Sequence, residues 1–241
     1  IVHTGARPVF CDIRKDQNID PYQLEKHITE RTKAIIPVHL TGKVADMNPI
    51  LQIAQKYNIH VIEDSAQAVG ASYYGKKAGS LGIAGCFSLH PLKNLNAAGD
   101  AGIITTNDDQ LAHKIRLIRN HGMVDRNTIT EWGYNSRLDC LQAAILNVRI
   151  KYLDSVIEKR RQNAKQYRSL LSGVVDCPQD ADNCFDVCHL FVIQCNNRDE
   201  LQNYLKENGI NTGVHYPVPI HLLDACKDLN YKSGDYPETE R

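Results

Sequence analysis

Residues 34–63 read AIIPVHLTGKVADMNPILQIAQKYNIHVIE, and this stretch decides the fold class. Its opening, Ala34 to Leu40, is an apolar run of the length expected for a buried strand. Asp46 is then expected to cap a helix from Met47 to Tyr57, whose apolar residues recur at helical spacing. A second apolar run, His60 to Glu63, follows. Strand, helix and strand in this order predict an α/β domain with parallel strands.

The same alternation continues on both sides of this stretch. We expect further strands at Pro8–Ile13, at Cys86–Leu89 and at Gly102–Thr106. Asn107 is expected to cap a helix that follows the last of these strands. The sheet should therefore be largely parallel and flanked by helices, with ligands bound beyond the carboxyl ends of its strands.

The second half of the chain has a different pattern. Residues Leu138 to Leu171 form a long helical stretch with a break or kink expected at Asp154. A strand at His189–Cys195, a helix at Arg198–Glu207 and a strand at Ile210–Tyr216 should follow. This order indicates a smaller α+β unit.

The two patterns predict two domains, a large α/β domain over residues 1–150 and a small α+β domain over residues 151–241. The chain opens at Ile1 without an initiator Met and closes at Arg241 without a terminating pattern. We therefore expect both domains to be incomplete, as in a fragment of a longer protein.

Composition excludes several classes of function. Lys plus Arg and Asp plus Glu both number 28, so no basic excess favours nucleic acid as a partner. No run approaches the roughly 20 apolar residues of a membrane span. Eight cysteines scattered from Cys11 to Cys226 indicate reduced thiols of a cytoplasmic protein. Cys184, Cys188 and His189 are close in sequence, but no second cluster completes a metal site, so none is expected.

Two segments place polar groups where predicted strands end. In Val61–Gln67, Asp64 follows an apolar strand and suits either a positively charged ligand nitrogen or a helix cap. In Phe87–Leu95, Ser88 ends a strand, and Lys93 lies between apolar residues on a short loop. A lone lysine is usually a surface charge, but a partly desolvated one has a lowered pKa and acts as a nucleophile.

A third segment, Gly133–Asp139, leads into the long helix. Its Asn135 and Arg137 suit a phosphate or carboxylate, and helix capping is an equally good interpretation. None of the three segments decides the function alone.

Taken together, segments along the whole chain resemble the DegT/DnrJ/EryC1/StrS sugar aminotransferases, which are pyridoxal-phosphate enzymes of fold type I. The order of the matching segments makes the resemblance far more specific than any one motif. They are GARPVFCDI, RTKAIIPVHLTGKVADM, VIEDSAQAVGA, CFSLHPLKNL, RNHG, GYNSRLDCLQAAIL and TGVHYPVPIH.

The resemblance implies a role for each matched residue. Lys93 takes the position of the lysine that carries pyridoxal 5'-phosphate. Asp64 matches the partner of the pyridine nitrogen, and Gln67 matches the residue beside the ring hydroxyl. Ser88 matches a phosphate ligand, and Asn135 matches a phosphate ligand supplied by the other subunit of a homodimer.

Three further residues, Arg137, His215 and Tyr216, lie in segments that resemble sugar contacts. The implied reaction moves an amino group from an amino acid, expected to be glutamate, to a nucleotide-linked keto-sugar. Lys93 would then move the proton between substrate carbon and cofactor carbon. The family's usual Gly-Thr turn before the first strand is absent here, so the pocket is expected to lack one phosphate contact.

Two alternatives remain open. Some relatives are pyridoxamine-phosphate-dependent sugar dehydratases with His in place of the lysine, and Lys93 argues against that activity. The other alternative is a regulator that binds the cofactor or a sugar nucleotide without catalysis. The complete set of Asp64, Gln67, Ser88 and Lys93 argues against a degenerate site.

Overall fold

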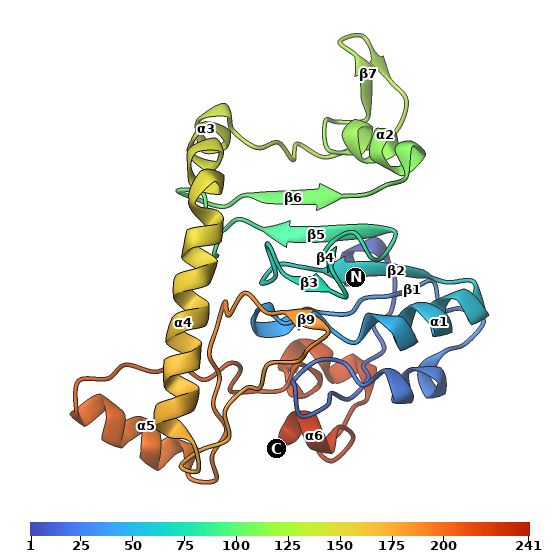
Figure 1. The fold of residues 1–241 in the computed structure, drawn as a ribbon. Helices are drawn as coiled ribbons and strands as arrows, with labels where there is room; N and C mark the ends of the chain where they lie inside the picture. Colours follow the sequence, from blue (N-terminus) through green and yellow to red (C-terminus); the bar gives the residue numbers. More distant parts are fainter.

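A four-stranded sheet lies at the centre of the structure, a computed structural model that describes residues 1–241 (Figure 1). The sheet has the order β1-β2-β5-β6. Its strands are β1 (Ala34–Ile35), β2 (His60–Asp64), β5 (Ala84–Ser88) and β6 (Gly102–Thr105). The first three strands are parallel, and β6 runs antiparallel to β5. The mostly parallel sheet predicted from the sequence is confirmed.

Strand β1 is shorter than the predicted run from Ala34 to Leu40. Pro37 has no N–H to give to a ladder, so regular pairing stops before it. The chain nevertheless stays beside β2. Val38 forms an isolated parallel bridge to Asp64, and the His39 N–H donates to the Asp64 carbonyl at 3.0 Å. This contact fixes the carboxyl end of β2.

Helix α1 (Met47–Tyr57) connects β1 and β2 and begins after Asp46, as predicted. The Asp46 side chain does not cap it. Its carboxylate instead accepts a hydrogen bond from the Tyr73 hydroxyl at 2.7 Å and pairs with Arg14 at 3.3 Å. Asp46 therefore ties the start of α1 to two distant segments.

Helix α2 (Asp109–Ile118) follows β6, one residue later than predicted. Asp108 is its N-cap, and the prediction of Asn107 was wrong. The Asp108 carboxylate accepts hydrogen bonds from the N–H groups of Gln110 and Leu111. A carboxylate satisfies these unpaired groups and also complements the positive end of the helix dipole.

The long helical stretch is divided into α3 (Cys140–Arg149), a 3-10 turn η4 (Ile150–Tyr152) and α4 (Leu153–Leu171). The break lies in η4, so the prediction of a break at Asp154 was wrong. Asp154 is in the first turn of α4, where its charge complements the helix dipole. Because helical backbone continues through residues 150–153, the division into two domains near Lys151 stays a prediction.

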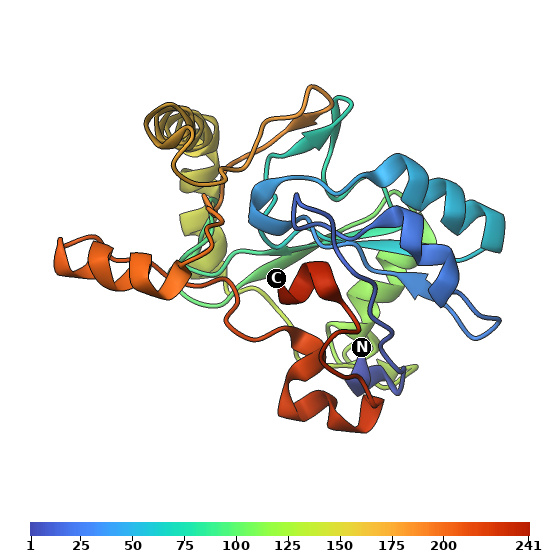
Figure 2. The same cartoon turned by 90° about the horizontal axis from the view of Figure 1, so that it is seen from below.

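Helix α4 runs along one side of the molecule (Figures 1 and 2). Its buried side chains are Ile157 and Ala164. Ile157 belongs to the main apolar core, which also contains Ile50 from α1, Val61 from β2 and Val187 from the last third of the chain. The core therefore joins α4 and the C-terminal residues to the sheet.

Three predicted strands are not formed, and those predictions were wrong: Pro8–Ile13, His189–Cys195 and Ile210–Tyr216. Only single antiparallel bridges occur there, at Ile13 and at Gln194. An apolar run becomes a strand only where a neighbouring strand takes up its N–H and C=O groups. Beyond these two bridges, no strand pairs with these runs.

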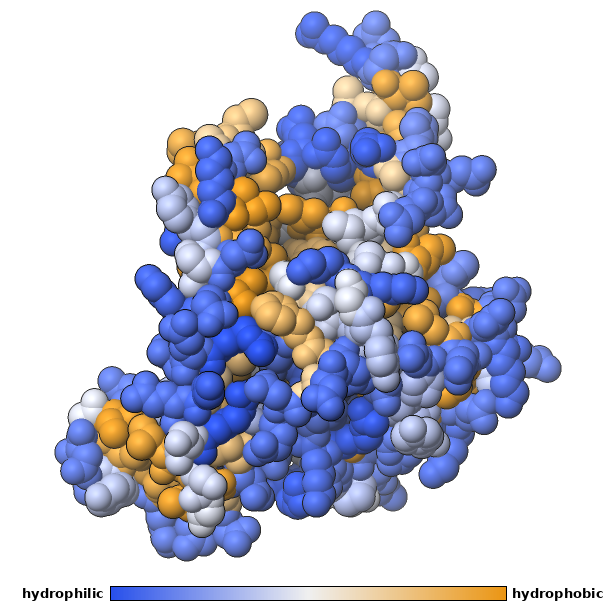
Figure 3. All heavy atoms as spheres, in the orientation of Figure 1, coloured by the Kyte–Doolittle hydropathy of each residue, from blue (hydrophilic) through white to orange (hydrophobic).

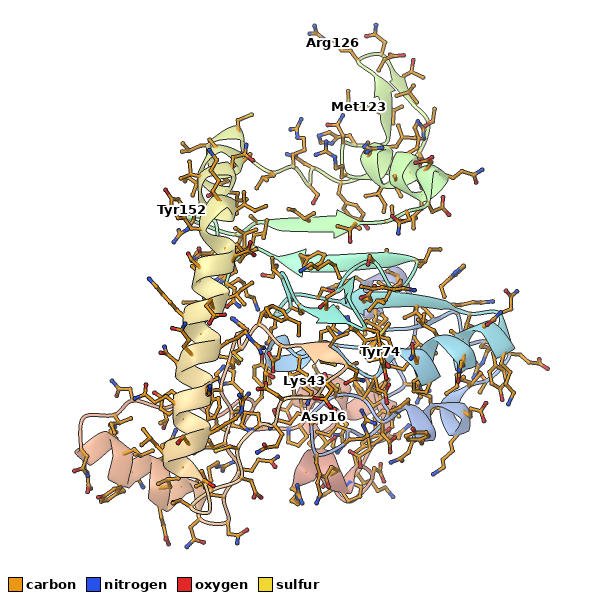
Figure 4. All side chains as sticks on the ribbon, viewed as in Figure 1. Asp16, Lys43, Tyr74, Met123, Arg126 and Tyr152 are labelled. Atoms are coloured by element: carbon orange, nitrogen blue, oxygen red, sulfur yellow. The ribbon has the colours of Figure 1, made fainter.

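The predicted helix at Arg198–Glu207 is confirmed as α5. The remaining elements are short: η1 (Val2–Thr4), η2 (Pro21–His27), η3 (Leu40–Gly42), β3 (Ser72–Tyr73), β4 (Lys76–Lys77), β7 (Met123–Asp125), β8 (Thr128–Ile129), β9 (Cys184–Phe185), η5 (Ile220–Leu222), η6 (Asp224–Leu229) and α6 (Pro237–Glu240). The β7–β8 hairpin projects beyond the sheet, as the labelled Met123 and Arg126 show in Figure 4. None of the helices is both long and apolar enough to span a bilayer.

Candidate active site

The carboxyl ends of β2 and β5 lie side by side, because Asp64 pairs with Cys86 in the parallel register. Asp64 and Ser88 line one open hollow of about 360 Å³. Apolar walls are supplied mainly by Ile36, Ile62 and Phe87. The structure therefore brings two of the predicted cofactor ligands to one edge of the sheet, where ligands of parallel sheets bind.

Asp64 has one carboxylate oxygen in use and one free. Its Oδ1 accepts the N–H of Ala66 at 3.1 Å, and its Oδ2 accepts no hydrogen bond within the chain. Its backbone N–H donates to the Pro37 carbonyl at 2.9 Å. The carboxylate is thus held at the strand end with one oxygen open to a ligand.

Lys93 lies on the loop between β5 and β6, with its backbone N–H bonded to the His90 carbonyl at 2.8 Å. Its side chain is half-buried, and its Nζ makes no hydrogen bond or ion pair within the chain. Burial lowers the pKa of Lys93 below its ordinary value, and the negative charge of Asp64 partly opposes that shift. This environment increases the fraction of the amine that is unprotonated and nucleophilic.

Gln67 is oriented by the turn that follows β1. Its Oε1 accepts the N–H of Thr41 at 2.6 Å, while its Nε2 donates to no group in the chain. Thr41 has φ 61°, in the left-handed region, and the next residue is Gly42. The carbonyl end of the amide is therefore fixed, and the donor end is available.

These residues fit pyridoxal phosphate chemically. Each uses one group to hold itself and leaves a complementary group unpaired: the Asp64 Oδ2 for a ring N–H, the Gln67 Nε2 for a ring hydroxyl, the Ser88 hydroxyl proton for phosphate and the Lys93 amine. Ser88 Oγ accepts the N–H of His90 at 3.3 Å, so its proton has no partner within the chain. A lysine amine together with an aspartate for the ring nitrogen is the pair that marks a pyridoxal phosphate site.

Glu63 and His39 form a buried pair that the sequence analysis did not identify. Both side chains are fully buried, and their Oε2 and Nε2 atoms lie 3.0 Å apart. Glu63 also accepts N–H groups from Gly79, Leu81 and Gly82, each at 2.7 Å. Burial opposes ionisation, but the hydrogen bonds from His39, Gly82 and Gly79 lower the pKa of Glu63 overall.

This pair supports the site because Glu63 directly precedes Asp64 and binds the turn that leads into β5. The signal in the sequence was a carboxylate at a buried position of an apolar strand. A carboxylate is almost never fully buried without a partner. His39, in the neighbouring apolar run, was the group to look for.

Asn135 and Arg137 lie away from these residues. Both are exposed, and Arg137 Nε donates to Asn135 Oδ1 at 3.0 Å. Arg137 also donates to Asn120 Oδ1 at 3.3 Å. Neither side chain makes a hydrogen bond to Asp64 or Lys93.

His215 and Tyr216 are exposed on the segment after α5, with their rings 5.3 Å apart. His215 is close enough to His189 for its charge to lower the pKa of that residue, as the charge of Lys93 also does. Lys93 and His215 therefore both lie near His189.

The model of the DegT/DnrJ/EryC1/StrS aminotransferase family matches residues 1–241. The "Pleiotropic regulatory protein" of Geobacillus stearothermophilus is 50% identical over 100% of this chain and 66% of its own length. The dTDP-3-amino-3,4,6-trideoxy-alpha-D-glucose transaminase of Streptomyces venezuelae is 40% identical over 98% of this chain and 63% of its own length. The chain thus spans just under two thirds of these relatives.

Solved structures agree with the family match. The crystal structure of S. venezuelae DesV in complex with a ketimine intermediate superimposes with a TM-score of 0.96 at 40% identity, covering 99% of this chain and 65% of DesV. The fold type I architecture expected from the sequence is confirmed. Pyridoxal phosphate is the cofactor of the family's aminotransferases. The chain belongs to the DegT/DnrJ/EryC1/StrS aminotransferase family.

Proposed function

We propose that the protein transfers an amino group from an amino acid, glutamate, to a nucleotide-linked keto-sugar, with Lys93 as the catalytic residue. The observation that carries this proposal is the Lys93 amine, which is half-buried, unpaired and lowered in pKa beside Asp64. A solvated surface lysine lacks the burial that lowers this pKa. The transaminase of S. venezuelae, 40% identical to this chain, supports the reaction class and a nucleotide-linked sugar as substrate.

The residues of the site divide the chemistry between them. Pyridoxal phosphate, when bound, supplies an aldehyde for amines and a ring that accepts electrons from the carbon next to nitrogen. Asp64 would hold the ring nitrogen through Oδ2, Gln67 the ring hydroxyl through Nε2, and Ser88 the phosphate through its hydroxyl proton. Lys93 Nζ would take a proton from the carbon of the amino donor and deliver it to the cofactor carbon in the first half of the reaction, and it would move a proton in the opposite direction in the second half.

We also propose a homodimer in which Asn135 of one subunit binds the cofactor phosphate of the other. Asn135 is exposed, and its side chain meets only Arg137 of its own chain. Large apolar side chains are exposed nearby, namely Trp132 at 99%, Tyr134 at 69% and Leu141 at 74%. Figure 3 shows apolar residues gathered over α3, the helix that carries Leu141. Such a patch suits a subunit interface.

On the substrate side, Arg137, His215 and Tyr216 would bind the sugar nucleotide. All three are exposed, and His215 lies near His189, as Lys93 also does. Arginine suits the diphosphate of such a substrate because its planar donors match phosphate oxygens. We place the reaction in the cytoplasm, since all eight cysteines are free thiols.

A regulatory protein is the second candidate, because the relative from G. stearothermophilus carries that name at 50% identity. Regulation by cofactor or sugar-nucleotide binding requires no free amine at the site. The unpaired amine of Lys93 therefore favours catalysis. It also argues against a dehydratase, in which His replaces this lysine.

The test is the absorbance spectrum of the whole protein with pyridoxal phosphate, before and after glutamate. We expect a band of the lysine-bound cofactor that glutamate bleaches. Lys93→Ala should lack the band, while Lys165→Ala, an exposed lysine on α4, should keep it. A band that persists in Lys93→Ala would contradict the role of Lys93. A wild-type band that does not respond to any amino acid would favour the regulatory protein.

A further inference from the structure

Residues 186–190, which follow β9, cross between the Thr41 turn and the Lys93 loop. On the first side, the Val187 N–H donates to the Gly42 carbonyl at 3.2 Å, and the Leu190 N–H donates to the Thr41 carbonyl at 3.1 Å. Gly42 permits this approach. A Cβ there would lie 2.8 Å from the Val187 side chain and 2.9 Å from the His189 nitrogen. The segment is therefore packed directly onto the turn that orients Gln67.

On the other side, the segment holds Asn94, the residue after Lys93. The Asn94 Nδ2 donates to the Val187 carbonyl at 3.1 Å. Its Oδ1 lies 3.2 Å from Nδ1 of His189. Because the amide nitrogen is already a donor, Oδ1 is the acceptor, and His189 Nδ1 carries the proton. Both ends of the Asn94 amide are thus fixed by one segment.

His189 is neutral and in a single tautomer near pH 7. It is buried, and burial, followed by the charges of Lys93, Arg160 and His215, lowers its pKa to about 4. Its backbone is also anchored, since Arg160 donates to the His189 carbonyl at 3.0 Å. The imidazole is therefore a fixed hydrogen-bond donor toward Asn94.

The contacts form a continuous path of hydrogen bonds from Asn94, the neighbour of Lys93, to Gln67. It runs through Asn94, then Val187, then the turn at residues 41–42, whose Thr41 N–H holds the Gln67 amide at 2.6 Å. Lys93 and Gln67 come from different loops, which also meet where Val69 packs against Leu89 and Leu95. The crossing segment sets the position of one relative to the other.

We propose that Asn94 and His189 are a positioning pair that fixes the Lys93 loop against the turn at Thr41 and Gly42, which holds Gln67. This inference rests on the proposed function for its meaning, since it concerns where the catalytic amine stands. Neither residue needs to touch substrate. Their effect is to keep the Lys93 amine at its half-buried position, with Asp64 and His189 as the charged or titratable groups that face it.

The first test reads the amine without cofactor. Trace acetic anhydride labels the cofactor-free whole protein across a pH series, and mass spectrometry of the Lys93 peptide gives the pH of half-maximal reactivity. We expect His189→Ala and Asn94→Ala to raise this midpoint by about half a unit, because a loosened loop lets water reach the amine. His189→Asn keeps an N–H donor near Nδ1 and should match wild type. His113→Ala, an exposed residue on α2, is the control.

A midpoint unchanged in both alanine variants, with circular dichroism unchanged, would overturn the positioning pair. So would a His189→Asn variant that behaves as His189→Ala does. If His189→Ala does not fold, Asn94→Ala decides the question alone.

The second test separates covalent from noncovalent binding of the cofactor. Borohydride trapping of pyridoxal phosphate on Lys93 should slow roughly tenfold in His189→Ala, because the amine is displaced. The Kd for pyridoxamine phosphate, which forms no bond to Lys93, should stay unchanged. Equal losses of both would indicate a general collapse of the site and contradict the proposal. If wild type itself is not trapped at Lys93, the proposed function fails, whereas the acetylation result still decides the positioning pair.

Discussion

The sheet edge at β2 and β5 and the region from the β7–β8 hairpin to Asn135 differ in how their polar groups are satisfied. At the sheet edge, the single carboxylate of Glu63 accepts hydrogen bonds from His39 and from three backbone N–H groups of the same chain. In the hairpin region, Trp132 is 99% exposed. The Asn135 side chain is hydrogen-bonded only to Arg137. In the first region the buried Glu63 carboxylate is satisfied within the chain, and the groups left open belong to the candidate site. The second has open polar and apolar groups, as the proposed homodimer requires.

The largest expected effect tests whether Asn135 acts across subunits. Lys93→Ala and Asn135→Asp should each be inactive, the second because a carboxylate repels the cofactor phosphate. Mixing the two whole proteins under subunit exchange should restore about a quarter of wild-type activity, since half the dimers are mixed and each has one intact site. Steady-state assays of the mixture check this. No recovery despite exchange would place Asn135 in its own subunit's site or outside any site.

Removal of the Glu63 carboxylate should cause the largest loss of stability. Glu63→Ala leaves His39 and three N–H groups buried without a partner. We expect the free energy of unfolding to fall by about 3–5 kcal/mol. Urea denaturation of this chain measures it, with the exposed Glu158→Ala as control. A loss as small as that of the control would mean that the sheet edge does not depend on this pair.

Acid should lower the free energy of unfolding of the chain through the buried His189. The pKa of His189 is lowered from 6.5 to about 4, so the unfolded chain takes up its proton first as the pH falls. Stability present above pH 6.5 is therefore lost toward pH 4, by about 1–3 kcal/mol. His189→Asn should flatten this dependence in urea titrations, and His113→Ala should not. The same slope in both variants would contradict the assignment.

The smallest expected effect belongs to the hairpin region. Trp132→Ala removes an exposed side chain, so the free energy of unfolding of the chain should change by less than about 0.5 kcal/mol. In the whole protein the same change should weaken the dimer roughly tenfold or more, as measured by sedimentation. An unchanged dimer would exclude Trp132 from the interface. A large fall in the free energy of unfolding of the chain would show that the Trp132 side chain packs against its own chain.

Much of the fold was predictable from local pattern. The stretch from Ala34 to Glu63 gave strand, helix and strand because hydrophobic spacing is a local property. The runs His189–Cys195 and Ile210–Tyr216 misled, since strand formation depends on a partner that no single segment reveals.

The sequence could nominate site residues one by one, but it could not reveal the contacts that support them. Motif resemblance selected Asp64, Gln67, Ser88 and Lys93, and the geometry of the chain is consistent with their proposed roles. The contact between Asn94 and His189 joins residues 95 positions apart. Spacing in the sequence carries no signal for such a contact.

The crossing of residues 186–190 over the Lys93 loop also orders events during biosynthesis. On the ribosome, the strands that present Asp64 and Ser88 emerge long before the segment that secures Asn94. The amide of Asn94 must wait for a carbonyl 93 positions downstream. Contacts of such separation form late, because the intervening chain must first be ordered. A nascent chain released before residue 190 would thus have its sheet but not the contacts that hold the Lys93 loop. The reactive amine would reach its final position in one of the last steps of folding.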